Sequence, residues 1–497
     1  MVKTIFNLPL PQRQNIAIIG AGAMGVSTAC ILAKLGIANI SVFEAESKAF
    51  NENGASVNNT GILHHFVYGG HQKTLKHLFQ QSILFRKLMP DYVFGDDHVN
   101  YLVPNKIENT ALNQAGITFK DVANSLVDIY QDHLHNYQSE SFLGQPENLI
   151  KILDKADIES LVRNPTSTKQ NIAGGVKVRQ CILNLAEYIC HMISLFNSLV
   201  TDNMIEINYS KKVRNIAINN QEFELNINRA DPLLYFDTVV NAGYAKGLSI
   251  PIPELKNEQY IEGNLVKLKV YGLYKISSDL KKQFPEIDKS FSSTIFIRGQ
   301  YGGIIKVGYD YLAIFSGQEY NQAELDFPIT KTPQDMPREW LHNLEKITGR
   351  TEAEMLTAIK QDIAQWVPWV KGLENIKLKK AVQVYPGRKF ANDLDAAKRD
   401  HNPVRYLYQH KNGGKYIHIP GFKLTSIPYN ALQVILEILS SYISQGILTQ
   451  EQVDQHITID QNKYMILSPE MNDVLGKDLA QLKISEREKI LDEWGIY

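Results

Sequence analysis

The stretch with the clearest chemical meaning lies near the N-terminus, at residues 16–44. It carries three glycines in the spacing GxGxxG and ends on an acid, Glu44. Gly20 permits a tight turn, Gly22 lets a pyrophosphate approach the backbone, and Gly25 allows a helix to pack closely. Glu44 can accept hydrogen bonds from the hydroxyls of an adenosine ribose. These residue types at this spacing predict a dinucleotide-binding site.

The glycines can act only if a strand, a turn and a helix position them. An apolar run at 16–19 predicts a buried parallel strand, a helix is expected to end at Gly36, and 40–43 predict a second strand. The start of the helix, with Ala23 and Met24, would offer free N–H groups and a positive dipole end to phosphates. The acid after the second strand disfavours a 2′-phosphate, so the motif predicts FAD or NAD rather than NADP. It does not separate FAD from NAD.

Length and composition set broad limits. A chain of 497 residues is expected to form two or more domains. Lys and Arg number 52 against 53 Asp and Glu, and this balance does not support a nucleic-acid partner. The cysteines Cys30, Cys181 and Cys190 form no CxxC motif, which favours a reducing compartment. We expect no signal peptide, because the N-terminal segment has no long apolar region, and no transmembrane helix, because no run of about 18 apolar residues occurs. We therefore expect a cytoplasmic protein, with peripheral contact at the inner face of the membrane left open and the oligomeric state not predicted.

Changes in hydrophobic periodicity predict two interleaved domains. Parallel α/β patterns occur at both ends and in the middle of the chain, whereas 260–316 alternates with period two, as antiparallel strands do. A nucleotide-binding domain assembled from separated segments, with a second domain inserted twice, is therefore expected. The nucleotide-binding segments are expected at 1–90, 171–255 and 381–449, the inserted segments at 91–170 and 256–380, and a C-terminal helical tail at 450–497.

Other segments are assigned from local pattern alone. Apolar residues at helical spacing predict helices at 72–88 and about 429–445, and 337–373 reads as one helical segment. A polar run that contains His133 and His135 is expected to be a loop. These two histidines have no cysteine or carboxylate partners at ligand spacing, so no metal site is predicted.

Four stretches in this order resemble the FAD-dependent oxidoreductases of the D-amino-acid oxidase type. The first is the glycine motif with its acid. The second, 59–64 (NTGILH), is similar to the N-S-G-V-I-H stretch of the hydroxy-acid and glycerophosphate members. The third, 237–243 (DTVVNAG), resembles the strand and turn that return under the adenine half of the cofactor. The fourth joins Gly387-Arg388 to 421–425 (GFKLT), and is similar to the G-x-R and G-G-K-L-T segments near the flavin ring.

This family includes glycerol-3-phosphate dehydrogenase, L-2-hydroxyglutarate oxidase, malate:quinone oxidoreductase, and glycine and sarcosine oxidases. The chain departs from the family pattern after His64, where it reads HFVYG, and at Lys389, where proline is common. No cysteine lies in the C-terminal half, so a cysteinyl link to the flavin is not expected, and a histidyl link stays open.

The resemblance implies an α/β fold: a Rossmann-like FAD-binding domain of the glutathione-reductase type, with an inserted α+β substrate domain built on an antiparallel sheet. It also implies FAD as the cofactor. The FAD contacts that it implies, together with the glycine motif, are Gly20, Gly22, Ala23, Met24, Gly25, Glu44, Asn59, Thr60, Gly61, Leu63, Val213, Ala242, Gly243, Gly387, Gly421, Phe422, Lys423, Leu424 and Thr425.

The resemblance places His64 beside the flavin ring. Imidazole titrates near neutrality, so His64 is the expected catalytic base, with His65 as the alternative. Arg388 suits a bidentate grip on a carboxylate or phosphate, and is expected to bind the substrate. Arg298 and Tyr301 are further candidates for substrate binding.

These expectations amount to an enzyme that transfers hydride from a small anionic substrate to flavin N5. The carbon oxidised is expected to bear a hydroxyl, as in a 2-hydroxy acid. The alternatives are an amino-acid or secondary-amine oxidase, a nicotinamide-dependent dehydrogenase, and a subunit that binds FAD or NAD without turnover. The electron acceptor is left open among oxygen, a quinone and another protein.

Overall fold

The computed structural model of the chain describes most of the sequence. The described residues are 4–52, 54–64, 72–89, 93–94, 98–104, 119–137, 143–161, 172–180, 182–219, 221–227, 232–254, 264–284, 287, 291–297, 302–307, 310–316, 321–327, 339–385, 405–419, 423–461 and 464–476.

The first large sheet is assembled from strands far apart in the sequence. Its order is β19-β20-β12-β1-β2-β8. The central strand β1 runs parallel to both neighbours, with Ile16 opposite Ile40 on one side and Thr238 on the other. The strands are β1 (Gln14–Ile19), β2 (Ala38–Phe43), β8 (Ile205–Asn208), β12 (Thr238–Asn241), β19 (Arg405–Gln409) and β20 (Lys415–His418).

Three helices cover one face of this sheet. The helix α1 (Ala23–Leu35) packs between α6 (Leu185–Thr201) and α13 (Ile427–Ser444), and every residue of α1 is buried. The opposite face packs on a small antiparallel sheet of β9 (Asn215–Ile218), β10 (Phe223–Asn226) and β11 (Leu234–Phe236). The predicted Rossmann-like domain is thus confirmed.

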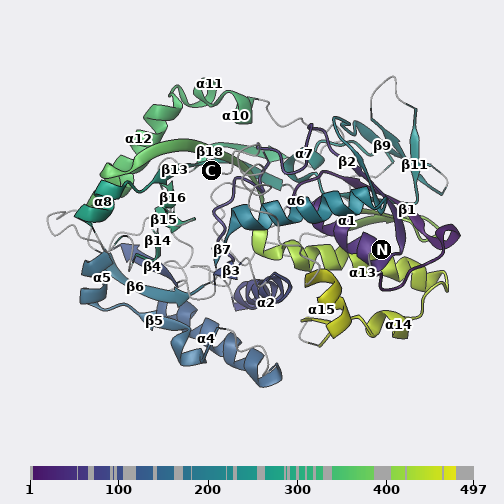
Figure 1. The fold of residues 1–497 in the computed structure, drawn as a ribbon, viewed down its shortest axis with the longest axis horizontal. Helices are drawn as coiled ribbons and strands as arrows, with labels where there is room; N and C mark the ends of the chain where they lie inside the picture. Colours follow the sequence, from purple (N-terminus) through teal and green to yellow (C-terminus); the bar gives the residue numbers. More distant parts are fainter. Residues whose placement is uncertain are drawn as a thin grey trace.

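The second large sheet has nine strands, in the order β17-β13-β16-β15-β14-β4-β6-β5, with β18 also paired to β13. All its pairs are antiparallel except β4 with β14. Figure 1 shows this sheet at the left and top of the molecule, and the first sheet with α1, α6 and α13 at the right. The strands are β4 (His98–Pro104), β5 (Ile150–Ile152), β6 (Ile172–Arg179), β13 (Asn264–Lys275), β14 (Ser293–Phe296), β15 (Gly302–Lys306), β16 (Tyr311–Phe315), β17 (Asn321–Phe327) and β18 (Glu374–Tyr385).

Two of these strands cross the expected domain limits. β6 belongs to the second sheet although residues from 171 onward are expected in the nucleotide-binding domain, and β18 continues five residues past 380. Both strands pair along their length with strands of the second sheet. Alternation of polar and apolar residues predicts a strand but does not show to which domain the strand belongs. The sheet boundaries therefore lie near 180 and 385.

The segment expected to be helical at 337–373 is helical in its described part but is broken into several elements. The segment divides into α10 (Glu339–His342), α11 (Leu344–Thr348), α12 (Glu352–Ile363) and the 3-10 turn η6 (Pro368–Gly372). Gly349 breaks it with φ +67°, and Thr351 then caps α12 with a capping box. α12 covers the second sheet, where Trp366 stacks on Phe296 with ring centroids 4.7 Å apart.

The expected loop around His133 is wrong. His133 and His135 lie in the last turn of α4 (Phe119–Asn136). The buried ring of His133 packs against Phe79, Tyr137 and Tyr464. Phe79 belongs to α2 (Gln72–Leu88), which has the predicted bounds. His133 is therefore buried mainly by residues distant in the chain, whereas its polar neighbours Asp132 and His135 stay exposed.

The described part of the C-terminal tail is not all helical. It contains α14 (Gln450–Asp454), a hairpin of β21 (Ile457–Ile459) and β22 (Met465–Leu467), and α15 (Pro469–Gly476). The buried Lys34 of α1 donates a hydrogen bond of 2.5 Å to Val474 O. Lys34 therefore links the tail directly to the first helix of the glycine motif.

Short elements complete the described structure. They are η1 (Leu10–Gln12), β3 (Val93–Phe94), η4 (Pro146–Asn148), α5 (Lys155–Leu161), β7 (Ile182–Leu183), α7 (Tyr244–Gly247), α8 (Ser278–Gln283) and η8 (Leu424–Ser426). Within the described ranges, no helix is both long and apolar enough to cross a membrane.

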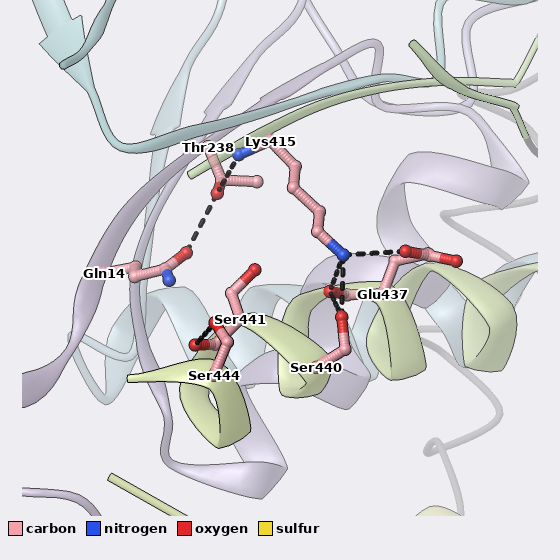
Figure 2. A network of polar contacts seen from close by, with 7 residues as sticks. All are labelled: Gln14, Thr238, Lys415, Glu437, Ser440, Ser441 and Ser444. Carbon is pink, nitrogen blue, oxygen red and sulfur yellow. Dashed lines mark hydrogen bonds and ion pairs between the residues drawn. The ribbon is translucent and has the colours of Figure 1, made fainter. Parts of the chain in front are cut away.

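A buried lysine joins α13 to the first sheet. Lys415 Nζ donates to Glu437 O and Oε2, each at 2.8 Å, and to Ser440 Oγ at 2.7 Å (Figure 2). The backbone N–H of Lys415 donates to Thr238 Oγ1, and the Thr238 hydroxyl donates to Gln14 Oε1 at 2.9 Å. The network thus connects β20, β12 and β1 to the last long helix.

Replacing Glu437 with alanine is expected to lower the free energy of unfolding by about 1–3 kcal/mol, because the buried ammonium of Lys415 loses its carboxylate. Lys415→Met removes the buried ammonium itself and leaves the Glu437 carboxylate, which is partly exposed to water, so this variant is expected to cost less. Urea denaturation measures both changes. The exposed pair Lys155–Glu159 gives a control, since Glu159→Ala is expected to leave the midpoint unchanged. Equal midpoints for Glu437→Ala and Glu159→Ala would contradict a stabilising role for the network.

Candidate cofactor-binding and active site

A cavity of about 590 Å³ lies at the carboxyl ends of β1 and β2. This is the edge of a parallel sheet at which ligands bind in folds of this class. Its walls come from the glycine motif, the segments after β2, β8 and β12, and the turn before α13. We call the part of the chain built on the first large sheet the first unit and the part built on the second large sheet the second unit. His342 of α10 and Val382 of β18 line the cavity from the second unit. The cavity is therefore shared by the two units of the chain.

The glycine motif forms one wall. Gly20 has φ +96°, a conformation that favours glycine, and Gly22 both lines the cavity and precedes α1. A Cβ on Gly25 would lie 1.9 Å from Gly20 O, so only glycine allows α1 to approach β1 so closely. Gly22 has no side chain to cap the α1 N-terminus, and Ser56 Oγ accepts from only the first amide of the helix, that of Ala23. The other amides of the first turn and the helix dipole are available to a pyrophosphate.

Glu44 lies where the adenosine ribose is expected. Its Oε2 accepts from Ala21 N at 2.7 Å and its Oε1 accepts from Glu46 N at 2.9 Å. Burial raises the pKa of Glu44, although the two amides and the nearby Lys246 act in the opposite direction. A carboxylate has about four acceptor sites, so two remain for ribose hydroxyls. The glycine motif and the N-terminus of α1 fit a pyrophosphate, and Glu44 fits a ribose. Together they fit the adenosine diphosphate half of FAD.

An ion pair crosses the same end of the cavity. Lys246 Nζ of α7 lies 2.7 Å from Glu46 Oε1, in the segment after β2, and both residues line the cavity. Val213 and Lys212, for which the resemblance implies an adenine contact, also line this cavity. Both charged groups are partly exposed, so this pair lies at the solvent-accessible side of the cavity and not in its buried wall.

Residues 59–64 lie between the two units and are held through their backbone. Tyr271 on β13 donates its hydroxyl to Asn59 O at 3.3 Å. Leu183 N donates to Gly61 O at 2.8 Å, and a Cβ on Gly61 would lie 2.6 Å from Leu183 O. Because Gly61 also has φ +77°, this position requires glycine.

The end of the same segment carries His64. Gln180 Nε2 donates to Leu63 O at 3.2 Å, and Tyr101 donates its hydroxyl to Gln180 Oε1 at 2.8 Å. His64 N donates to Thr425 Oγ1 at 2.8 Å. The structure thus brings together the second and fourth sequence stretches, which are 361 residues apart in the chain.

The helix α2 supports the turn before α13. Gln81 Oε1 accepts from Ser426 Oγ at 2.5 Å, and Gln81 Nε2 lies 2.7 Å from His77 Nε2. Gln81 and Ser426 are both buried. Together with Thr425, this contact fixes the η8 turn next to Leu424 and Ile427, which line the cavity.

A second cation lies on the inner face of the second sheet. Lys379 of β18 is directly opposite Tyr271 of β13, and burial lowers the pKa of Lys379 to about 8. Tyr271 contacts Asn59, so Lys379 lies on the face of the sheet that meets residues 59–64. No group of three or more possible metal ligands occurs in the described ranges.

The predicted site residues divide into three groups. Those that line the cavity are Gly20, Gly22, Ala23, Met24, Glu44, Asn59, Val213, Ala242, Gly243 and Leu424. Those that belong to its supporting segments are Gly25, Thr60, Gly61, Leu63, His64, Lys423 and Thr425. Those that lie outside the described residues are His65, Arg298, Tyr301, Gly387, Arg388, Gly421 and Phe422.

Sequence reasoning missed several lining residues. Asn51, Gly54, Ala55 and Ser56 line the cavity, and Ser56 Oγ accepts from Ala23 N at 3.0 Å. The segment that contains them is rich in Asn, Gly and Ser, and that composition marked it only as a loop. No local pattern indicated Gln81 or Gln180.

We expect acid to release the cofactor through Glu44. Ribose hydroxyls would favour its ionised form, so FAD affinity is full above the raised pKa of the free enzyme and falls as the pH drops through it. The decline should begin above 4.5, the ordinary value for glutamate. Titration of FAD binding by fluorescence quenching at several pH values measures this. Glu44→Gln is expected to bind FAD more weakly and without this step, and an unchanged step in that variant would contradict the assignment.

Comparison with known proteins agrees with this geometry. Residues 15–243 match the family model described as FAD dependent oxidoreductase (DAO). No curated protein sequence matches the chain. Among solved structures, it is similar to glycine oxidase from Geobacillus kaustophilus at 13% identity and TM-score 0.54, over 86% of this chain and 95% of that one.

Two further structures give the same result. L-amino acid deaminase from Proteus vulgaris matches at 13% identity and TM-score 0.54, over 87% of this chain and 95% of that one. A modified fructosyl peptide oxidase from Aspergillus nidulans matches at 13% identity and TM-score 0.55, over 86% and 90%. At this identity the likeness concerns the fold alone, and the family match describes residues 15–243. The chain carries in those residues an FAD-dependent oxidoreductase domain of the DAO family, and FAD is its cofactor.

Proposed function

We propose that this enzyme oxidises a small carboxylate-bearing substrate at a carbon that bears an amine. The observation that carries the proposal is the hydrogen bond from His64 N to Thr425 Oγ1, because Thr425 directly follows Leu424, which lines the cofactor cavity. The solved structures with this fold support an amine, since their names refer to glycine, L-amino acids, L-proline, iminodiacetate and fructosyl peptides. Each of these is an amino acid or a derivative of one.

The residues around the cavity have distinct roles in this proposal. FAD, when bound, supplies the acceptor for the hydride that leaves the substrate carbon. His64 accepts the proton of the substrate heteroatom, and the hydrogen bond from its backbone to Thr425 holds it in position. Lys379 adds positive charge on the inner face of the second sheet, where a carboxylate would be attracted.

The turn before α13 contributes electrostatically. α13 begins at Ile427, which lines the cavity together with Leu424. The N-terminus of an 18-residue helix carries partial positive charge, which stabilises negative charge at this end of the site. Gln81 keeps the turn fixed by accepting from Ser426, so the charge stabilisation is in place before reaction.

A second candidate function is oxidation of a 2-hydroxy acid at its hydroxyl-bearing carbon. The similarity of 59–64 to the hydroxy-acid and glycerophosphate members favours it. The same base and the same positive charge would serve this reaction. The two candidates therefore differ in the substrate and not in the roles of His64 and Lys379.

Matched pairs of substrates decide between them. The purified FAD-loaded enzyme would be assayed with an artificial electron acceptor on glycine against glycolate, alanine against lactate, and glutamate against 2-hydroxyglutarate, with proline added. The proposal predicts turnover with an amine member and little with its hydroxy partner. Faster turnover with the hydroxy member of a pair would establish the second candidate and overturn the first.

A further inference from the structure

Tyr244 has a backbone conformation that a tyrosine rarely adopts. It follows Gly243 at the turn between β12 and α7 and has φ +52°, in the left-handed region. A bulky residue is unfavourable there and persists only where its surroundings fix it. Such positions are frequently functional, so the contacts of Tyr244 are informative.

The surrounding turn is fixed by a single buried amide. Asn241 Oδ1 accepts from Gly243 N at 3.2 Å, and Asn241 Nδ2 donates to Gly247 O at 3.0 Å and to Tyr416 Oη at 2.9 Å. Gly247 N donates in turn to Gly243 O at 3.0 Å. The turn that carries Tyr244 is therefore held at both ends and cannot relax alone.

The side chain of Tyr244 reaches the other unit. Its hydroxyl accepts a hydrogen bond of 3.1 Å from Val384 N on β18. In the described part of the second sheet β18 pairs only with β13, so this amide lies on the edge away from that strand. Val382, two residues earlier, lines the cofactor cavity. Tyr244 thus connects the turn after β12 to the same end of β18 that forms part of the cavity wall.

Tyr244 itself also lines that cavity, between Gly243 and Lys246. One residue therefore faces the cofactor site and bonds the edge of the second sheet. We propose that Tyr244 is a positioning residue that couples occupancy of the cavity by FAD to the order of β18. FAD packed against the turn would restrict the ring of Tyr244. The hydroxyl of the restricted ring would then keep its hydrogen bond from Val384 N and so hold this end of β18 in order. The proposal depends on FAD binding and not on the substrate of the enzyme.

Hydrogen exchange of the full chain tests the coupling, with and without FAD, followed in peptides that cover 374–385. In the wild type, FAD is expected to slow exchange at this end of β18 by about tenfold or more. Tyr244→Phe keeps the ring and loses the hydroxyl. It is expected to be saturated by FAD still, since the ring that lines the cavity is kept, while the FAD-dependent protection of β18 disappears.

Tyr274→Phe is the matched control. Its hydroxyl donates to Leu356 O at 2.8 Å within the second unit, so FAD-dependent protection should remain. Tyr244→Gly suits the left-handed backbone and removes the ring, and should also abolish protection. Wild-type protection in either Tyr244 variant, or no effect of FAD on β18 in the wild type, would overturn the proposal. Loss of FAD binding in Tyr244→Phe would overturn it too, because the hydroxyl would then be a cofactor ligand.

Discussion

Replacing His64 with glutamine is expected to slow reduction of the bound flavin by about 10²- to 10⁴-fold, the usual contribution of a general base. FAD should stay bound, because the contact of residue 64 with Thr425 uses the backbone N–H. The neutral amide of glutamine cannot accept the substrate proton near neutral pH, whereas an imidazole can. Stopped-flow measurement of flavin reduction under anaerobic conditions gives the rate directly.

Two further variants make this result specific. His456 lies in the C-terminal part of the chain, where its ring packs on Phe6. His456→Gln should leave the rate of flavin reduction unaltered. His65→Gln tests the neighbouring alternative from the sequence. Reduction of His64→Gln at the wild-type rate would show that His64 is not the base, and a slow His65→Gln enzyme would then transfer the role.

Substitutions of two glycines in one motif are expected to fail in different ways. A Cβ at position 22 would meet only Ser56 Oγ, at an ordinary 3.4 Å, so Gly22→Val should fold. Its side chain would occupy the space in which the pyrophosphate approaches α1, and FAD affinity should fall by about 100-fold, which corresponds to roughly 2.7 kcal/mol.

Gly25→Ala should instead damage the fold. Its Cβ would lie 1.9 Å from Gly20 O, a backbone atom that cannot move aside without separating α1 from β1. We expect a loss of about 3 kcal/mol or more in the free energy of unfolding of the apoprotein. Thermal unfolding without FAD, together with FAD titration, separates the two effects. An apoprotein of Gly25→Ala as stable as that of Gly22→Val would contradict this geometry.

Local pattern was sufficient where an element is determined by its own sequence. The glycine motif predicted β1, α1 and β2, and amphipathic spacing predicted α2 with its observed bounds. These elements each bury a face whose period can be read from the residues. The same reasoning predicted α13, within two residues at its start.

Elements that depend on distant partners could not be predicted in this way. His133 is helical and buried because α4 packs on α2 and on Tyr464, while its own neighbours are polar. The break at Gly349 divides a segment whose composition suits one long helix. In the C-terminal tail, the hairpin of β21 and β22 consists of three-residue strands, too short to show a period.

The site shows the same division. Motif residues such as Gly22 and Glu44 were recognised because each has a local chemical reason. Gln180 and Gln81 were not, since each acts on a backbone or hydroxyl group 117 or 345 residues away in the chain. A buried glutamine has no sequence signature, and only the fold shows which carbonyl or hydroxyl it contacts.

The most direct test is anaerobic titration of the purified FAD-loaded enzyme with the amino acids and hydroxy acids of the matched pairs. The absorption band of oxidised flavin at about 450 nm reports the reaction. The account predicts that one of these substrates bleaches the band completely, and that an electron acceptor restores it. A band that none of these small carboxylates bleaches, in an enzyme with FAD bound, would contradict the central claim that the cavity and His64 form a site for oxidising them.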